Sequence, residues 1–296
     1  MSGDVVFRQS ALRGIFLMML AVALFAMLDT VVKYLGQHYP VPGLVFARYG
    51  VHLLVMLILL APRRGFDLLR TSRPGIQILR SLLLLGASFF FFTALQYLPL
   101  AEAAAIGFVT PFLVTAFSVP LLGEKVGIRR WSAVAAGFLG VLVIIRPGAE
   151  AFTVGAIFPL LMALCYSIYQ ILTRKISAHE DAIVSLFFTA LVGTIVMSAV
   201  LPFAWVTPAS AWHGALVVAT GCLGAFGHFA LIKALAHAPA SVLAPFSYSQ
   251  LLWVTLFGFL VFGDLPDGIA VLGMGIIIAS GLYIASREAQ ARRGQG

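Results

Sequence analysis

Long apolar segments, separated by short polar ones, recur along almost the whole chain of 296 residues. A bilayer core about 30 Å thick is crossed by about 20 mostly apolar helical residues, so each apolar segment predicts one membrane-spanning helix. The pattern predicts ten such helices, at residues 13–35, 43–61, 75–97, 101–122, 129–146, 153–173, 182–203, 211–234, 240–262 and 267–286. We therefore expect an all-α integral membrane protein.

The composition supports a membrane protein. Hydrophobic residues make up 61% of the chain and charged residues 10%, whereas soluble domains carry about 25% charged residues. The formal net charge of +8 raises nucleic acid as a partner, but a nucleic-acid-binding protein gathers its basic residues on one exposed face. Here they are spread over the short segments between apolar ones, so we expect the lipid bilayer and not nucleic acid. Cys165 and Cys222 lie in apolar segments and are expected to be buried thiols.

The basic residues also predict how the chain is oriented. With the N-terminus in the cytoplasm, all Lys and Arg residues except Lys33, Arg48 and Arg146 fall on the cytoplasmic side. The positive-inside rule therefore predicts a multi-pass protein of the cell inner membrane with both termini cytoplasmic. Arg80, at the cytoplasmic start of the third predicted helix, is expected to reach the lipid headgroups.

The chain contains an internal repeat. A shift of 140 residues aligns segment 94–125 with segment 234–265. Pro99, Gly123 and Glu124 then coincide with Pro239, Gly263 and Asp264. Each copy holds five predicted helices, an odd number, so the second copy must enter the membrane from the opposite side. We expect two inverted five-helix repeats, at 1–148 and 149–287, and a cytoplasmic tail at 288–296; such repeats are typical of transporters, with the binding site near the midplane between them.

Several separated motifs point to one family. They are Lys33 at the end of the first helix, Arg48 in "FARYG", "LPLAEAA" at 98–104 and "LLGEKVGIRRW…GFLGVLVIIRPG" at 121–148. Together they resemble the drug/metabolite transporter superfamily, specifically its EamA-type members. The resemblance implies a ten-helix carrier that works by alternating access, with a cavity among the first, third, fourth, sixth, eighth and ninth helices. It also implies a small organic solute as substrate.

Ionisable side chains occur within the first two predicted helices. Asp29 and Arg48 share a depth in the membrane, and Asp29 lies one helical turn from Lys33. An isolated charge in hydrocarbon costs at least roughly 2.5 kcal/mol. Two alternatives follow: a fixed ion pair between Asp29 and Arg48 joins the two helices, or Arg48 binds an anionic substrate group and Asp29 exchanges a proton. The candidate gate or coupling residues are Asp29, Lys33, Arg48, His52 and His228.

Polar side chains also lie at the middle of the fourth, sixth and ninth predicted helices. The run "APFSYSQLLW" at 244–253 is the least lipid-like of them, and polar groups at this depth are tolerated where they line protein or water. Pro111 in the fourth helix predicts a bend there. The candidate substrate-binding residues are Thr110, Tyr166, Tyr169, Gln170, Ser247, Tyr248, Gln250 and Trp253.

The expected function is secondary transport of an amino acid, carboxylate, nucleotide-derived or vitamin-like solute, driven by a solute or proton gradient. The cationic residues on the outer half favour a solute with a carboxylate or phosphate. The chain shows no metal-spaced His/Cys set, nucleotide-binding glycine loop or nucleophile elbow, so we expect neither an enzyme nor a cofactor. A lipid scramblase, or a membrane enzyme without a recognisable motif, is the alternative. A homodimer is left open.

Overall fold

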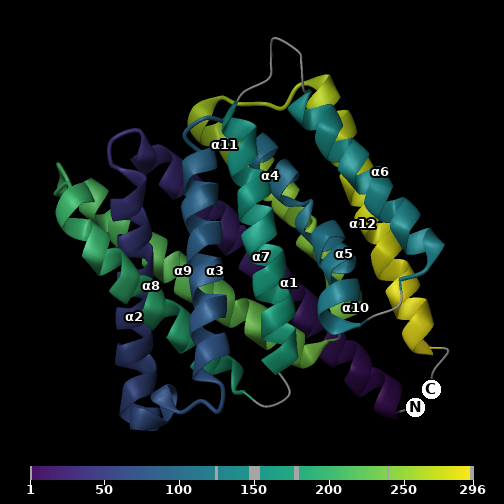
Figure 1. Cartoon of the computed structure of the whole chain (residues 1–296), viewed down its shortest axis with the longest axis horizontal. Coiled ribbons are helices and arrows are strands. Elements are labelled where there is room, and N and C mark those ends of the chain that lie inside the picture. The colour runs from purple at the N-terminus through teal and green to yellow at the C-terminus, as the bar shows by residue number, and fades with distance from the viewer. Residues whose placement is uncertain (1, 124–125, 147–153, 177–179, 239, 294–296) are drawn as a thin grey trace.

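The computed structural model describes residues 2–123, 126–146, 154–176, 180–238 and 240–293. Within these ranges every regular element is a helix. The elements are α1 (Ser2–Gly36), α2 (Val41–Arg64), η1 (Gly65–Leu69), α3 (Pro74–Ala94), α4 (Leu100–Gly107), α5 (Thr110–Leu122), α6 (Ile128–Ile145), η2 (Val154–Ala156), α7 (Ile157–Ile176), α8 (Ala182–Ala204), α9 (Ala211–His237), α10 (Ala240–Ser247), α11 (Ser249–Phe262) and α12 (Gly268–Arg293). Figure 1 shows a helical bundle in which the start of α1 and the end of α12 lie at the same end.

Most of these helices suit a bilayer. Eight of them are long and apolar enough to cross a membrane. They are Leu12–Leu35, Val41–Leu69, Pro74–Ala94, Leu100–Leu122, Val154–Ile176, Ala182–Ala204, Ala211–His237 and Pro245–Phe262. Two further apolar segments, Trp131–Ile145 in α6 and Gly268–Ile284 in α12, are shorter. The prediction of an all-helical, multi-pass membrane protein is thus confirmed.

Helix pairing sets the frame for the interior. The helix α1 packs mainly against α9 and α11, α2 against α8 and α9, and α3 against α7 and α8. At one edge of the bundle, α6 lies along α12 (Figure 1). These two helices can approach closely because residue 273 is a glycine. A Cβ at Gly273 would lie only 2.7 Å from the carbonyl oxygen of Gly140. The fully buried side chains of Leu35, Leu100 and Phe112 belong to the main hydrophobic core.

Two spans are bent near the middle. Phe108 and Val109 separate α4 from α5, and Tyr248 separates α10 from α11. Proline at position 111 has no amide hydrogen to continue the helical bonding, and the Thr110 hydroxyl donates to the carbonyl of Gly107 at 2.8 Å. The rings of Phe108 and Tyr248 stack on each other, with centroids 5.1 Å apart. The two bends, which lie 140 positions apart in the sequence, therefore meet in space.

The second bend depends on a glycine in α12. Tyr248 is buried, and its hydroxyl occupies the place that a side chain at Gly281 would fill. Substitution Gly281→Ala is expected to lower the free energy of unfolding by about 1–3 kcal/mol, because the ring must move out of a packed position. The measurement is thermal unfolding of the purified protein in detergent.

The matched control lies in the same helix. A Cβ at Gly275 would meet open space, so Gly275→Ala should leave the melting temperature unchanged or raise it slightly. Equal melting temperatures for the two variants would show that the packing of Tyr248 against Gly281 does not stabilise the bundle.

Candidate functional site

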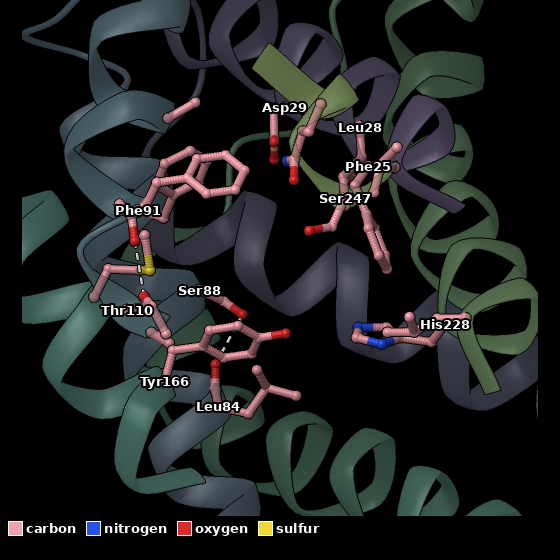
Figure 2. Close-up of a pocket in the computed structure, with 18 of the residues that line it drawn as sticks. Phe25, Leu28, Asp29, Leu84, Ser88, Phe91, Thr110, Tyr166, His228 and Ser247 are labelled. Carbon is pink, nitrogen blue, oxygen red and sulfur yellow. Dashed lines mark hydrogen bonds between the residues drawn. The ribbon is translucent and has the colours of Figure 1, made fainter. Parts of the chain in front are cut away.

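A cavity of about 360 Å³ lies inside the bundle, between helices of both halves of the chain. Its polar lining consists of Asp29, Arg48, Ser88, Thr110, Tyr166, Gln170, His228, Ser247 and Gln250. Figure 2 shows Asp29, Phe91, Tyr166 and His228 on different sides of this space. Since a polar side chain facing lipid is costly, a shared cavity explains why these groups occur at the middle of apolar helices.

The cavity brings together eight of the thirteen candidate residues. They are Asp29, Arg48, Thr110, Tyr166, Gln170, His228, Ser247 and Gln250. The other five do not line it: Lys33, His52, Tyr169, Tyr248 and Trp253. The residues of the first group come from α1, α2, α5, α7, α9, α10 and α11, so the site is assembled from both halves of the chain.

Arg48 is held on α2 with only 9% of its surface exposed. Its guanidinium donates to the Ser88 hydroxyl at 2.5 Å, and the Ser88 hydroxyl donates in turn to the carbonyl of Leu84. The guanidinium also lies over the rings of Tyr49 and Phe92, at 5.3 and 5.4 Å from their centroids. These contacts fix the position of the cation and leave further N–H groups available to the cavity.

Asp29 lies on α1 with 6% exposure. Its carboxylate interacts electrostatically with Arg48 and with the side chain of Gln250 on α11. Among the described residues, however, the salt bridges within 4.0 Å do not include an Asp29–Arg48 pair. The alternative of a fixed ion pair joining the first two helices is therefore not what the structure shows, and α1 packs on α9 and α11 instead.

Lys33 points away from the cavity. Its ammonium forms a salt bridge with Asp264 at 3.5 Å and donates to the carbonyl of Leu98 at 2.7 Å. It thereby ties the end of α1 to the turns that follow α11 and precede α4. A second ion pair, between Arg146 and Asp267, lies near the start of α12, and the hydrogen bond from Arg146 holds the pKa of Asp267 below its usual value.

The two candidate histidines stack on each other. The rings of His52 and His228 lie nearly parallel, with centroids 6.2 Å apart. His228 reaches the cavity and contacts the edge of Phe25. His52 lies behind it with 3% exposure, and its Nε2 atom has no hydrogen-bond partner in the part of the chain that is described.

Tyr169 connects the cavity to Arg80. The ring of Tyr169 stacks on that of Tyr166, with centroids 5.5 Å apart, and its hydroxyl accepts a hydrogen bond from Arg80 at 3.0 Å. Arg80 is 2% exposed. It also donates to Gln77, Thr173, the carbonyl of Ser185 and Thr189. The expectation that Arg80 reaches the headgroups is wrong, because α7 and α8 enclose the first turns of α3 and supply acceptors there.

The remaining candidates have packing positions. Tyr248 stacks on Phe108 at the meeting point of the two bends. Trp253 stacks on Phe257, one turn further along α11, with centroids 5.9 Å apart. Tyr248 therefore lies next to the site, because Phe108 lines the cavity, whereas Trp253 packs on a residue of its own helix.

Sequence reasoning missed several lining residues, including Phe25, Leu28, Leu84 and Ser88. Phe25 and Leu28 share the helical face of Asp29, and Leu84, Ser88 and Phe91 share one face of α3. The signal available in the sequence was Ser88, a hydroxyl in the middle of an otherwise apolar segment.

Comparison with known proteins agrees with this architecture. Residues 12–146 and 153–286 each match the EamA-like transporter family. The S-adenosylmethionine uptake transporter of Rickettsia conorii is 30% identical over 280 residues, covering 95% of both chains. The riboflavin transporter of Vibrio cholerae is 29% identical over 286 residues, covering 95% of this chain and 96% of the relative. One solved protein structure shares the fold with a TM-score of 0.63 at 20% identity, covering 98% of this chain and 99% of the other. Because the family match covers most of its length in two halves, the chain belongs to the EamA-like transporter family.

Proposed function

We propose that this protein is a secondary transporter that moves a small organic metabolite across the cell inner membrane by alternating access. The observation that carries the proposal is the cavity of about 360 Å³, which places charged and hydroxyl groups at the middle of membrane-spanning helices. Sites for small organic molecules have volumes of about 300–1,000 Å³ and combine apolar walls with a few polar groups. Family membership supports solute transport and not catalysis.

The proposed architecture has ten crossings in two inverted repeats, 1–148 and 149–287, with 288–296 as a tail. The shorter apolar segments of α6 and α12 supply the fifth and tenth crossings. Support comes from the bends at Phe108 and Tyr248, which recur at the offset of the sequence repeat and contact each other. The distribution of Lys and Arg supports cytoplasmic termini.

Transport follows from rocking of the two repeats around the cavity. Residues of both repeats hold the solute, so a relative movement of the repeats exposes the same site first to one side and then to the other. We assign Lys33 and Asp264 to the outer gate, because their salt bridge joins the end of α1 to the turn after α11. Energy comes from the gradient of the solute itself, of a counter-solute or of protons.

The aromatic wall supports a solute that contains a ring. Phe25, Phe91, Phe92, Phe108 and Tyr166 all line the cavity, and aromatic side chains stack well on planar rings. The relatives named for S-adenosylmethionine and riboflavin both carry ring-containing metabolites.

Flux through reconstituted protein tests the proposal. The purified chain is placed in liposomes, and uptake of labelled S-adenosylmethionine, riboflavin, amino acids, carboxylates and nucleosides is followed against protein-free liposomes. We expect saturable counterflow of at least one of these solutes. Absence of saturable flux for the whole set would reject the carrier function.

The assigned gate gives a separate prediction. Lys33→Gln should leave solute affinity in the cavity unchanged and alter the rate of exchange about two- to fivefold, since partly exposed ion pairs contribute up to about 1 kcal/mol. Single-turnover uptake in liposomes measures the rate. Lys175→Gln, an exposed lysine at the end of α7, is the control. An exchange rate equal to that of the control variant would remove Lys33 from the gate.

A further inference from the structure

The charges that line the cavity are balanced. Among its lining residues in the described part of the chain, the acidic and basic side chains other than His228 are one carboxylic acid, Asp29, and one guanidinium, Arg48. Lys33, which the sequence grouped with them, is outside and is neutralised by Asp264. The preference for an anionic solute rested on an excess of cations, and the cavity itself has no such excess.

The two groups have different neutral neighbours. The carboxylate of Asp29 interacts with the side chain of Gln250, which also lines the cavity, whereas the guanidinium of Arg48 donates a hydrogen bond to the hydroxyl of Ser88. Neither forms a salt bridge within 4.0 Å to any residue that the structure describes. An ion removed from water without an ionic partner carries a desolvation penalty of several kcal/mol. Each of these charges is therefore a site at which a ligand of opposite charge gains affinity.

Apolar and aromatic surface completes the site. Phe91 on α3 and Phe25 on α1 are seen at the same cavity as Asp29 (Figure 2). Phe92 lies under the Arg48 guanidinium, with 5.4 Å from its ring centroid to the guanidinium carbon. The site thus offers a cation-binding pole, an anion-binding pole and an aromatic wall within one cavity.

We propose that this cavity selects a zwitterion: an ammonium group of the solute binds Asp29 and Gln250, its carboxylate binds Arg48 and Ser88, and its ring contacts Phe25 and Phe91. This inference rests on the proposed transport function and names the substrate class of the same site. A purely anionic solute would leave Asp29 uncompensated, and a purely cationic solute would leave Arg48 uncompensated. Charge-assisted hydrogen bonds to both poles favour the solute that carries both charges.

Three probes that share the indole ring system but differ in charge separate these cases. L-tryptophan carries an ammonium and a carboxylate, tryptamine only the ammonium, and indole-3-propionate only the carboxylate. Binding to the full-length protein in lipid nanodiscs is measured calorimetrically at pH 7. We expect L-tryptophan to bind at least about tenfold more tightly than either analogue, because each lost hydrogen bond to a charged group weakens binding by about tenfold or more. Binding of either analogue at the affinity of L-tryptophan, or no binding of L-tryptophan, overturns the proposal.

Substitutions then assign the poles. Asp29→Asn should weaken binding of L-tryptophan and tryptamine about tenfold and leave indole-3-propionate unchanged. Arg48→Gln should weaken the binding of L-tryptophan and of indole-3-propionate by a similar factor and leave the binding of tryptamine unchanged. The controls are Asp67→Asn and Arg70→Gln, which break an exposed ion pair far from the cavity. If a variant keeps the wild-type melting temperature but loses binding affinity equally for all three probes, the assignment of that pole is contradicted.

The proposal and the transport function fail in different ways. The comparison of probes on the unsubstituted protein stays decisive if either variant misfolds. Saturable liposome flux of a solute with a single charge, combined with exclusion of zwitterions, overturns the zwitterion proposal and leaves the transporter intact. Absence of saturable flux for every solute overturns both.

Discussion

Arg48→Ala is expected to abolish transport while the protein still inserts into the membrane. Arg48 supplies the guanidinium that lines the cavity, is 9% exposed and donates a hydrogen bond to Ser88. Removing one partner of a buried charged contact weakens binding by about 2–5 kcal/mol, which corresponds to a loss of roughly thirtyfold to several thousandfold. The measurement is counterflow in liposomes, with the amount of inserted protein determined for each variant.

Two further variants make this result specific. Arg48→Lys keeps the charge but not the planar fork of donors, so it should retain part of the flux. Arg70→Ala removes a guanidinium that is 82% exposed and should transport like the unsubstituted protein. Normal flux in Arg48→Ala would remove this residue from the mechanism.

Arg80→Met is expected to cause the largest loss of stability. The guanidinium of Arg80 forms five hydrogen bonds to groups on α3, α7 and α8, and the side chain is 2% exposed. Methionine fills much of the same volume but donates no hydrogen bond, so buried acceptors on three helices lose a partner. We expect the free energy of unfolding to fall by about 3 kcal/mol or more, as found when buried polar networks are broken. Chemical unfolding in detergent measures this loss.

The control again uses an exposed arginine. Arg70→Met alters an ion pair on the surface, where such pairs contribute about 0–1 kcal/mol. If Arg80→Met unfolds at the same denaturant concentration as Arg70→Met, the bonds of Arg80 do not hold α3 to α7 and α8. Arg80→Lys, which keeps one charged donor group, should fall between the two.

The elements of the fold could be predicted because their signal is local. A run of about 20 apolar residues suffices to predict a crossing, and Pro111 suffices to predict a bend. The meeting of the bends at Phe108 and Tyr248 could be anticipated only through the repeat, since the two residues are far apart in the chain. The depth of Asp29 and Arg48 was likewise readable from helix length alone.

Partners of the charged residues could not be predicted, because they depend on which helices become neighbours. Lys33 is one turn from Asp29 in α1, yet its ionic partner is Asp264, on a turn far along the chain. Arg80 lies near enough to a helix end to extend to water, and only the packing of α7 and α8 on α3 decides that it turns inward. Local pattern gives depth in the membrane, whereas direction around the helix axis is set by tertiary packing.

The equal numbers of acidic and guanidinium groups in the cavity have an electrical consequence. Moving one elementary charge across a membrane potential of 100 mV changes its free energy by about 2.3 kcal/mol. A solute whose ammonium and carboxylate cancel moves no net charge, so the voltage of the cell neither accumulates nor expels it. If the flux changes with an imposed potassium diffusion potential, an ion such as a proton moves together with the solute. If the flux does not change with that potential, the concentration gradient of the solute is the driving force.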